Sequence, residues 1–332
     1  MSVGLAIFVF CACVAASLGA SLVFGRRLDV ISERLGASEG LHGLLTALGA
    51  DAPEISTAIV AVAASHGSVG VGVVIGSNVF NLAALFGLSA VVAGGVAMHR
   101  HGLVFNGLAA LLVTGIAAAL VLGAIGAVAA VILLVVVFCP YAFLLSIRPA
   151  RLHRVVPSGR ARRFLVAAIR EEVEDMQTGE PERRASAADV IALVLSLCVI
   201  VGASVGMVQA ATDLGRRWGV SDIVVGTLVL ATLTSLPNVL TAVRLALHGR
   251  GAAVVSEALN SNSLNILAGL ALPALFVSLA APTGVERFAV WFLLGMTAVA
   301  IGLAYSGHGL KRYEGALVVL LYVPFVIVVA TR

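Results

Sequence analysis

Two polar motifs occur twice in this chain, separated by the same number of residues. Pro237 lies 184 residues after Pro53, and Asn262 lies 184 residues after Asn78. Such a shared offset, kept over about 30 residues, is the mark of an internal structural repeat and is hard to obtain by chance. The two halves of the chain are therefore expected to fold in the same way.

Ten apolar stretches, five in each half, contain or flank these motifs. Of the 332 residues, 60% are hydrophobic and 11% are charged, whereas an ordinary soluble domain has roughly 25% charged residues. So few charges cannot cover a soluble protein of this size, so the water-soluble classes are excluded. A membrane-spanning helix takes about 20 residues, and the sequence predicts an all-α membrane protein with ten transmembrane helices. The predicted spans are 3–24, 39–64, 68–95, 103–122, 125–147, 187–212, 221–247, 251–279, 288–306 and 313–331.

The odd number of spans in each half decides how the halves are related. A copy that follows five spans enters the membrane from the opposite side, which makes the two copies an inverted repeat. Transporters built in this way hold their ions near the midplane of the bilayer, where the repeats meet. We predict a first five-helix repeat at 1–147 with core motifs at 38–95, and a second at 187–332 with core motifs at 221–279. Residues 148–186 would form a cytoplasmic loop between them.

The distribution of Lys and Arg predicts the orientation of the spans. With the N-terminus outside, seventeen of the 21 basic residues fall on inside segments, nine of them in the central loop. Basic residues are enriched in cytoplasmic loops of membrane proteins. The sequence thus predicts a multi-pass protein of the cell (inner) membrane with its central loop in the cytoplasm. Because these charges orient the spans, no nucleic-acid partner is expected, and nothing in the sequence specifies an oligomeric state.

Two prolines inside the predicted spans mark a candidate ion site. Pro53 and Pro237 each lack a backbone donor, which frees a carbonyl one turn earlier, near Gly49 and Leu233. Irregular backbone at membrane depth is tolerated only where it is buried in protein or faces a wet cavity. We therefore expect interrupted helices here, with carbonyl and hydroxyl oxygens that bind a cation.

At these residues the chain resembles the sodium/calcium exchanger family of the cation/Ca²⁺ antiporter superfamily. The family carries Gly-Thr-Ser-x-Pro-Glu on one helix of each repeat and Gly-Ser-Asn-x-x-Asn/Asp on the next. Residues 53–54 and 76–81 fit this pattern in the first half, and residues 234–237 and 261–265 fit it in the second. The resemblance implies a secondary active antiporter that exchanges Ca²⁺, or a related cation, against Na⁺ or H⁺ by alternating access at a midplane site.

The chain departs from the family pattern at several positions. Asn238 stands where the family has its second-repeat glutamate, and Asn265 stands at a position often held by aspartate or asparagine. The first repeat has Asp51 at the serine position, so it carries two acids, Asp51 and Glu54. Because these acids are three residues apart, they share one face if the helix continues through them. The glycine before Ser-Asn in the second repeat is replaced by Asn260.

The residues of these motifs supply oxygen ligands. Ca²⁺ takes six to eight oxygens, whereas zinc and copper sites use His and Cys, which the motifs lack. Two close carboxylates in a low dielectric resist ionising together, so proton coupling is an open hypothesis.

No covalent chemistry is implied by the motifs, so we expect no enzyme and no cofactor. The expected partners are inorganic cations and the lipid bilayer. The candidate metal ligands are Glu54, Asp51, Asn81, Ser77, Asn238, Ser235, Thr234, Asn265 and Ser261.

Alternatives remain for the function and for individual residues. The missing acids of the second repeat also fit a non-transporting or channel-like ion-sensing membrane relative. Asn78 and Asn262 are expected to brace the helices and not to bind ions. Glu257 lies one turn before Ser261 on the same helix face. It either replaces the missing charge of the second repeat or lies at the membrane interface near Arg250.

Overall fold

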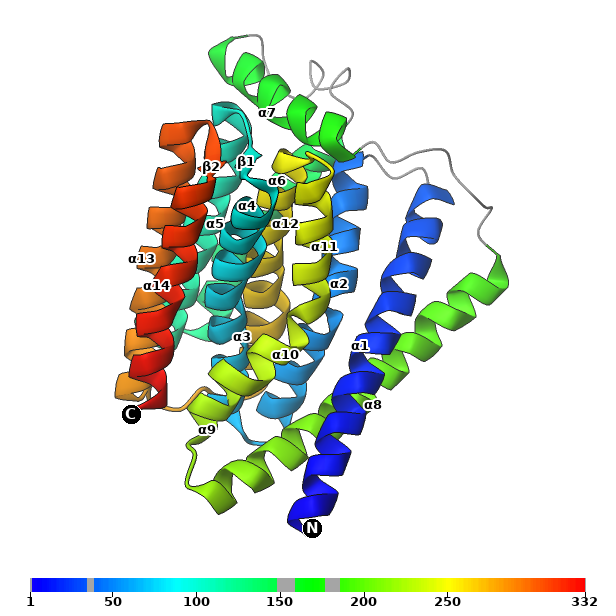
Figure 1. Cartoon of the computed structure of the whole chain (residues 1–332), viewed down its shortest axis with the longest axis vertical. Coiled ribbons are helices and arrows are strands. Elements are labelled where there is room, and N and C mark those ends of the chain that lie inside the picture. The colour runs from blue at the N-terminus through cyan, green and yellow to red at the C-terminus, as the bar shows by residue number, and fades with distance from the viewer. Residues whose placement is uncertain (1, 35–38, 148–158, 177–185, 332) are drawn as a thin grey trace.

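A computed structural model of the chain describes residues 2–34, 39–147, 159–176 and 186–331, and almost all of them are helical (Figure 1). The first half contains α1 (Val3–Arg34), α2 (Glu39–Ala63), α3 (Gly67–Asn81), the π-helix η1 (Leu82–Leu88), α4 (Ser89–Ala93), α5 (Arg100–Val121) and α6 (Ala127–Ser146). The second half contains α8 (Ala187–Trp218), α9 (Asp222–Val224), the π-helix η3 (Val225–Leu230), α10 (Ala231–Thr234), α11 (Leu236–Leu247), α12 (Gly251–Leu264), the π-helix η4 (Asn265–Ala271), the 3₁₀ turn η5 (Pro273–Leu275), α13 (Gly284–Gly307) and α14 (Arg312–Ala330).

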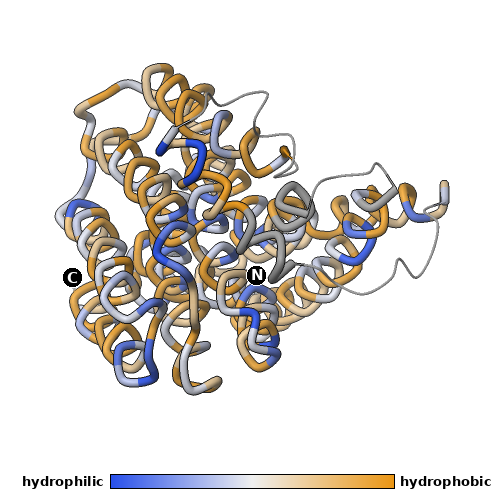
Figure 2. The backbone as a smooth tube through the Cα atoms, turned by 90° about the horizontal axis from the view of Figure 1, so that it is seen from above, coloured by the Kyte–Doolittle hydropathy of each residue, from blue (hydrophilic) through white to orange (hydrophobic). Residues whose placement is uncertain are grey.

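Most of these helices are long and apolar, as the backbone coloured by hydropathy shows (Figure 2). Within the described ranges, eight helices are long and apolar enough to cross a membrane, or nine when the bent pair 222–234 and 236–247 counts as one span. The predicted span at 251–279 corresponds to α12 and η4, which are helical but carry the polar Asn-Ser-Asn motif and are not among these nine. The all-α membrane class is therefore confirmed, whereas the count of ten spans stays a prediction.

The helices that carry the motifs form the centre of the bundle. In the most apolar part of each helix, 72% of the residues are buried in Leu44–Ala63 and 94% in Gly67–Ala93. The same share is only 28% in α6 and in α14. Every residue of α12 is buried. Outside this centre, α1 packs along α8 and both contact α2, and Figure 1 shows this pair beside the remaining helices. The polar motifs are thus surrounded by helices on every side.

Two of the three described π-helices, η1 and η4, lie at matching places in the two halves. η1 begins directly after Asn81, and η4 begins at Asn265, the residue that matches Asn81 in the repeat. A π-helical turn widens an α-helix locally and is frequent at functional sites. The repeat inferred from side chains is therefore also present in the backbone.

The two ends of the bundle differ. Both termini lie toward one end, and α7 (Arg160–Met176) lies at the opposite end, which we call the α7 end (Figure 1). The two-stranded antiparallel sheet of β1 (Gly95–Ala97) and β2 (Gly309–Lys311) is also at the α7 end. α7 lies within the segment predicted as a loop and packs on α2, α5 and α12. Residues 148–158 and 177–185 of that segment lie outside the described residues.

Glycines let the central helices of the two halves approach with their backbones in contact. A Cβ at Gly76 of α3 would overlap the backbone of Thr227 in η3, and one at Gly226 of η3 would overlap the backbone of Val69 in α3. Small residues at helix crossings permit such close approach in membranes. These crossings hold the motif of the first half directly against the second half.

Candidate cation-binding site

Helix α2 continues through Pro53, so the expected break in the first half is wrong. The helix runs without interruption over Glu39–Ala63. Ser21 Oγ of α1 donates a hydrogen bond to the carbonyl of Gly49 at 3.4 Å, which replaces the donor that proline lacks. Asp51 and Glu54 therefore lie on one face of a continuous helix, and they are 0% and 1% exposed.

The helix of the second half does break. The segments Asp222–Thr234 and Leu236–Leu247 are bent by 46° at Ser235, and Pro237 lies in the first turn of α11. Helix α11 contacts α2. The amide Nδ2 of Asn238 donates to Asp51 Oδ1 at 2.7 Å and to Glu54 Oε1 at 3.0 Å.

Helix α12 and η4 supply the other donors to the two acids. Ser261 Oγ donates to Asp51 Oδ1 at 2.5 Å, and the amide of Asn265 donates to Glu54 Oε2. Asn81 of α3 joins the network because its Nδ2 donates to Ser261 Oγ at 3.0 Å. The structure thus brings six of the nine candidate ligands into one hydrogen-bonded network, with every side chain at most 1% exposed.

The remaining three candidate ligands are hydroxyl groups that bond to their own helices. Ser77 Oγ donates to the carbonyl of Val74 at 3.1 Å, and Ser235 Oγ donates to that of Ala231 at 2.8 Å. Both hydroxyls also interact with the carboxylate of Glu54. Thr234 Oγ1 donates to the carbonyl of Leu230 at 2.9 Å, and the described contacts do not join it to either acid.

Several oxygens around the acids have no hydrogen-bond partner among the described residues. They are Asp51 Oδ2, Asn81 Oδ1, Asn238 Oδ1 and Asn265 Oδ1, all fully buried. Buried polar atoms are normally satisfied, and unpaired ones point to a ligand, ion or water. The described chain has no group of three or more His, Cys, Asp or Glu placed to hold a metal. The donor set is therefore two carboxylates with amide and hydroxyl oxygens, which suits a hard cation such as Ca²⁺ or Na⁺.

Asn78 and Asn262 join the two halves beside this network. Asn78 Nδ2 donates to the backbone carbonyl of Asn262 at 3.0 Å, and Asn262 Nδ2 donates to that of Asn78 at 3.1 Å. Asn78 Oδ1 also accepts a hydrogen bond from Asn265 at 3.4 Å. These bonds brace α3 against α12, which is the role expected from the sequence.

A second buried polar network was not anticipated. The hydroxyl of Tyr141 in α6 lies 2.5 Å from Oδ1 of Asn106 in α5 and 2.5 Å from Oδ1 of Asn260 in α12. Asn106 Nδ2 donates to Ser256 Oγ at 3.3 Å. The replacement of glycine by Asn260 in the family motif was the available signal, because a polar side chain in the membrane needs a partner.

Glu257 is buried, so its placement at the membrane interface near Arg250 is wrong. Its side chain is 6% exposed within the fully buried α12. None of the ion pairs in the described part of the chain joins it to Arg250. Its Oε1 has no hydrogen-bond partner among the described residues.

Comparison with known proteins gives a consistent result. The sequence profile of the sodium/calcium exchanger protein family matches residues 5–147 and 189–331. The sodium/calcium exchanger MaX1 of Methanosarcina acetivorans is 30% identical over 142 residues, which are 43% of this chain and 41% of that protein. The inner membrane protein YrbG of Escherichia coli is 32% identical over 131 residues, 40% of each chain. The matched part thus spans about two fifths of the length of these relatives.

The structure also resembles a solved exchanger along its whole length. The sodium-calcium exchanger NCX_Mj, soaked with 2.5 mM Na⁺ and 10 mM Sr²⁺, superposes with a TM-score of 0.63 over 98% of this chain and 99% of that chain, at 21% identity. This likeness shows the shared fold, and the profile match covers most of both halves. The chain therefore belongs to the sodium/calcium exchanger protein family.

Proposed function

We propose that the chain is a secondary active antiporter that exchanges Ca²⁺, or a related cation, against Na⁺ or H⁺ at the buried site around Asp51 and Glu54. The observation that carries the proposal is a pair of carboxylates inside the bundle, surrounded by amide oxygens that have no hydrogen-bond partner. Ionisable residues inside a membrane protein are costly and mark ion pathways by default. Membership of a transporter family favours transport over an ion-sensing role.

The residues of the site take different parts in binding. Asp51 and Glu54 supply the two negative charges that balance one Ca²⁺. The amides replace the family's second-repeat acids as neutral oxygen ligands, and the hydroxyls complete the shell of six to eight oxygens that Ca²⁺ takes. The proposed ligands are Glu54, Asp51, Asn81, Asn238, Asn265, Ser261, Ser77 and Ser235, with Thr234 farthest from the acids.

The exchange stoichiometry follows from charge. Two carboxylates that release one Ca²⁺ are neutralised again by two monovalent cations, so Na⁺ and H⁺ both satisfy the site. No covalent bond is made or broken in this cycle. The motive force is the gradient of the monovalent ion.

Alternating access requires elements that move past the central site. The α1–α8 pair packs on α2 at the side of the bundle, which makes it the proposed moving part. The distribution of Lys and Arg places the N-terminus outside the cell. Both termini lie toward the end of the bundle away from α7 (Figure 1), so we assign the α7 end to the cytoplasm.

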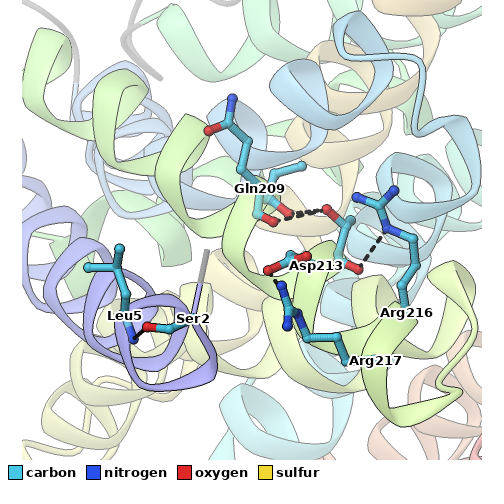
Figure 3. Close-up of polar contacts among 8 residues, drawn as sticks. Ser2, Leu5, Gln209, Asp213, Arg216 and Arg217 are labelled. Atoms are coloured by element: carbon cyan, nitrogen blue, oxygen red, sulfur yellow. Dashed lines mark hydrogen bonds and ion pairs between the residues drawn. The ribbon is translucent and has the colours of Figure 1, made fainter.

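The test is ion flux in everted membrane vesicles loaded with ⁴⁵Ca²⁺. Na⁺ and pH gradients are imposed separately, and we expect one of them to drive Ca²⁺ movement. Glu54→Gln, which keeps the side-chain volume, should abolish this movement. Asp213→Asn is the matched control, because Asp213 lies near the termini end of α8 and pairs with Arg217 at 3.1 Å (Figure 3).

The two gradients separate the outcomes. Movement that follows Na⁺ and ignores pH identifies Na⁺ as the coupling ion, and the reverse identifies H⁺. Ca²⁺ flux down its own gradient only, unaffected by either imposed gradient, would contradict the antiporter and favour the channel-like alternative. Flux unchanged by Glu54→Gln would remove Glu54 from the site.

A further inference from the structure

An apolar cavity lies between the α1–α8 pair and the rest of the bundle. Its volume is about 310 Å³, and its walls are the start of α1, the last turns of α8 and the π-helix η3. In Figure 1, α1 and α8 cross and then diverge toward the end of the bundle that holds the termini. Every residue that lines the cavity is apolar, and only the indole of Trp218 carries a polar side-chain atom. The cavity therefore offers a ligand apolar contacts along its length.

Small residues of α8 leave the space for this cavity. Helices α1 and α8 have 32 residues each and match along their whole length with the repeat offset of 184 residues. Ala211 and Gly215 line the cavity, whereas the matching residues of α1 are Arg27 and Ile31. Toward the α7 end, Arg27 pairs with Asp189 of α8 at 2.7 Å. An ion pair thus joins α1 and α8 toward one end of the bundle, and a cavity lies between them toward the other.

The cavity opens toward the bilayer. Ile7 of α1 and Val229 of η3 line it and are 42% and 39% exposed. Both α1 and α8 are long and apolar enough to cross a membrane, so side chains exposed between their ends face hydrocarbon. Trp218 ends α8 and is 61% exposed, and tryptophan is enriched where the bilayer meets water. A ligand therefore enters the cavity from the lipid, with the headgroups at the level of Trp218.

A basic side chain lies near the level of these headgroups. Arg216 is exposed, and its Nε donates to the backbone carbonyl of Thr212 at 3.3 Å (Figure 3). None of the ion pairs in the described part of the chain includes Arg216, whereas its neighbour Arg217 pairs with Asp213 at 3.1 Å. The charge of Arg216 is thus available to an anion from the bilayer. Phosphate is an anion with which a guanidinium pairs well.

Physical chemistry indicates what fills such a cavity. An apolar cavity of about 150 Å³ in another protein stays free of water and binds benzene. An empty space deprives its lining of dispersion contacts, which a hydrocarbon restores. We infer that one acyl chain of a membrane phospholipid occupies the cavity between α1, α8 and η3, with the phosphate of the lipid beside Arg216.

The experiment is photo-labelling of the full chain in vesicles of phosphatidylethanolamine and phosphatidylglycerol. A trace of the phosphatidylglycerol carries a diazirine in one acyl chain, and peptide mass spectrometry should find the label on the cavity residues of α1, α8 and η3. Val229→Phe fills the cavity and should lower this labelling about tenfold, which corresponds to about 1.4 kcal/mol. Val205→Phe is the matched control, because Val205 lies on α8 outside the cavity and is 38% exposed, like Val229 at 39%.

Two variants of Arg216 test the contact with phosphate. Arg216→Gln removes the charge and should lower the labelling about threefold, the size of effect expected of an exposed ion pair, whereas Arg216→Lys should retain most of it. A diacylglycerol with the same diazirine chain is the second probe, and its labelling should be the same in Arg216→Gln and the wild type. If the diacylglycerol labels the wild type as strongly as the phospholipid does, the assignment to a phospholipid is overturned.

Other outcomes contradict the lipid site as a whole. A label spread equally over the cavity and the exposed faces of α6 and α14 would show ordinary contact with bulk lipid. Labelling of the cavity that survives Val229→Phe would also overturn the inference. Where Val229→Phe does not fold, Ala211→Leu decides, because it adds bulk from the side of α8 and should lower the labelling about threefold.

The lipid site and the proposed function fail separately, because labelling needs no ion gradient. A chain that exchanges Ca²⁺ but takes no label in the cavity contradicts only the lipid site. A chain that is labelled in the cavity but moves no Ca²⁺ under either gradient contradicts only the antiporter.

Discussion

The two halves of the chain carry matching motifs but contribute different chemistry to the candidate site. The first half supplies both acids, Asp51 and Glu54, together with Asn81 and Ser77, whereas the second half supplies only amides and hydroxyls. Asn238, at the position of the family's second glutamate, donates to Asp51 Oδ1 at 2.7 Å. Positions 51 and 238 are therefore in contact between the two halves. A carboxylate at either position would lie in nearly the same part of the candidate site. An inverted repeat fixes the position of the site but not which half carries its charge.

The largest expected effect comes from removing the carboxylate of Asp51 and placing one at position 238, where the family has its second glutamate. Asp51→Ser removes one of the two carboxylates that balance a divalent cation, so gradient-driven ⁴⁵Ca²⁺ uptake should fall by about a hundredfold, equivalent to about 2.7 kcal/mol. Adding Asn238→Glu to this variant restores a carboxylate beside Glu54 from the other half. The double variant should recover uptake to within about tenfold of the wild type.

Two further results test this charge transfer. Asn238→Glu alone adds a third acid to the network and should lower uptake, since like charges in a buried site repel. Uptake that survives Asp51→Ser would show that Asp51 is not a ligand. A double variant that folds but stays as inactive as Asp51→Ser would show that the two positions are not interchangeable.

The contrast between Pro53 and Pro237 shows what local sequence predicts. Both prolines predicted an interrupted helix, yet only the second half bends, by 46°. In the first half Ser21, which belongs to another helix, donates to the carbonyl that Pro53 frees. Loss of a backbone donor is a local property and is readable in sequence. Its compensation is a tertiary contact, and nothing in the spacing of the motif predicts it.

The candidate site likewise combines features that the local sequence predicts with tertiary contacts that it does not. The repeat and the polar motifs predict that Asp51, Glu54 and the amides lie together where the two halves meet. The network of Tyr141, Asn106 and Asn260 was missed because its members lie on three separate spans and follow no common motif. Burial of Glu257 was one of two open alternatives, since one acid near a helix end fits both an interface and an interior.

The bracing pair gives a second, smaller test of symmetry. Asn78→Ala and Asn262→Ala each remove an amide that donates to a backbone carbonyl of the other half, so each should cost about 1–3 kcal/mol of stability. Asn78 Oδ1 also accepts from Asn265, whereas Asn262 Oδ1 has no partner in the described chain. Asn78→Ala should therefore lower the Tm in detergent more, and it alone should weaken stabilisation by Ca²⁺. Equal effects on both readouts would mean that the pair is symmetric in function as well as in geometry.

The smallest expected effect compares two tyrosines, one from each half of the chain. Tyr141 lies 2.5 Å from two amide oxygens near the central site, whereas the hydroxyl of Tyr322 meets only that of Thr232, at 3.4 Å, among its described hydrogen bonds. Tyr141→Phe should destabilise the protein by about 1 kcal/mol, the net worth of one buried hydrogen bond, and Tyr322→Phe by less. The measurement is the Tm of both variants beside the wild type, with the KM for Ca²⁺ from each face. Since the polar network lies on the α7 side, only Tyr141→Phe should change the KM, and only from that face. A change of the KM from both faces would show that the network of Tyr141 acts on the central site itself. The two ends of the bundle would then differ in packing and not in the path that ions take.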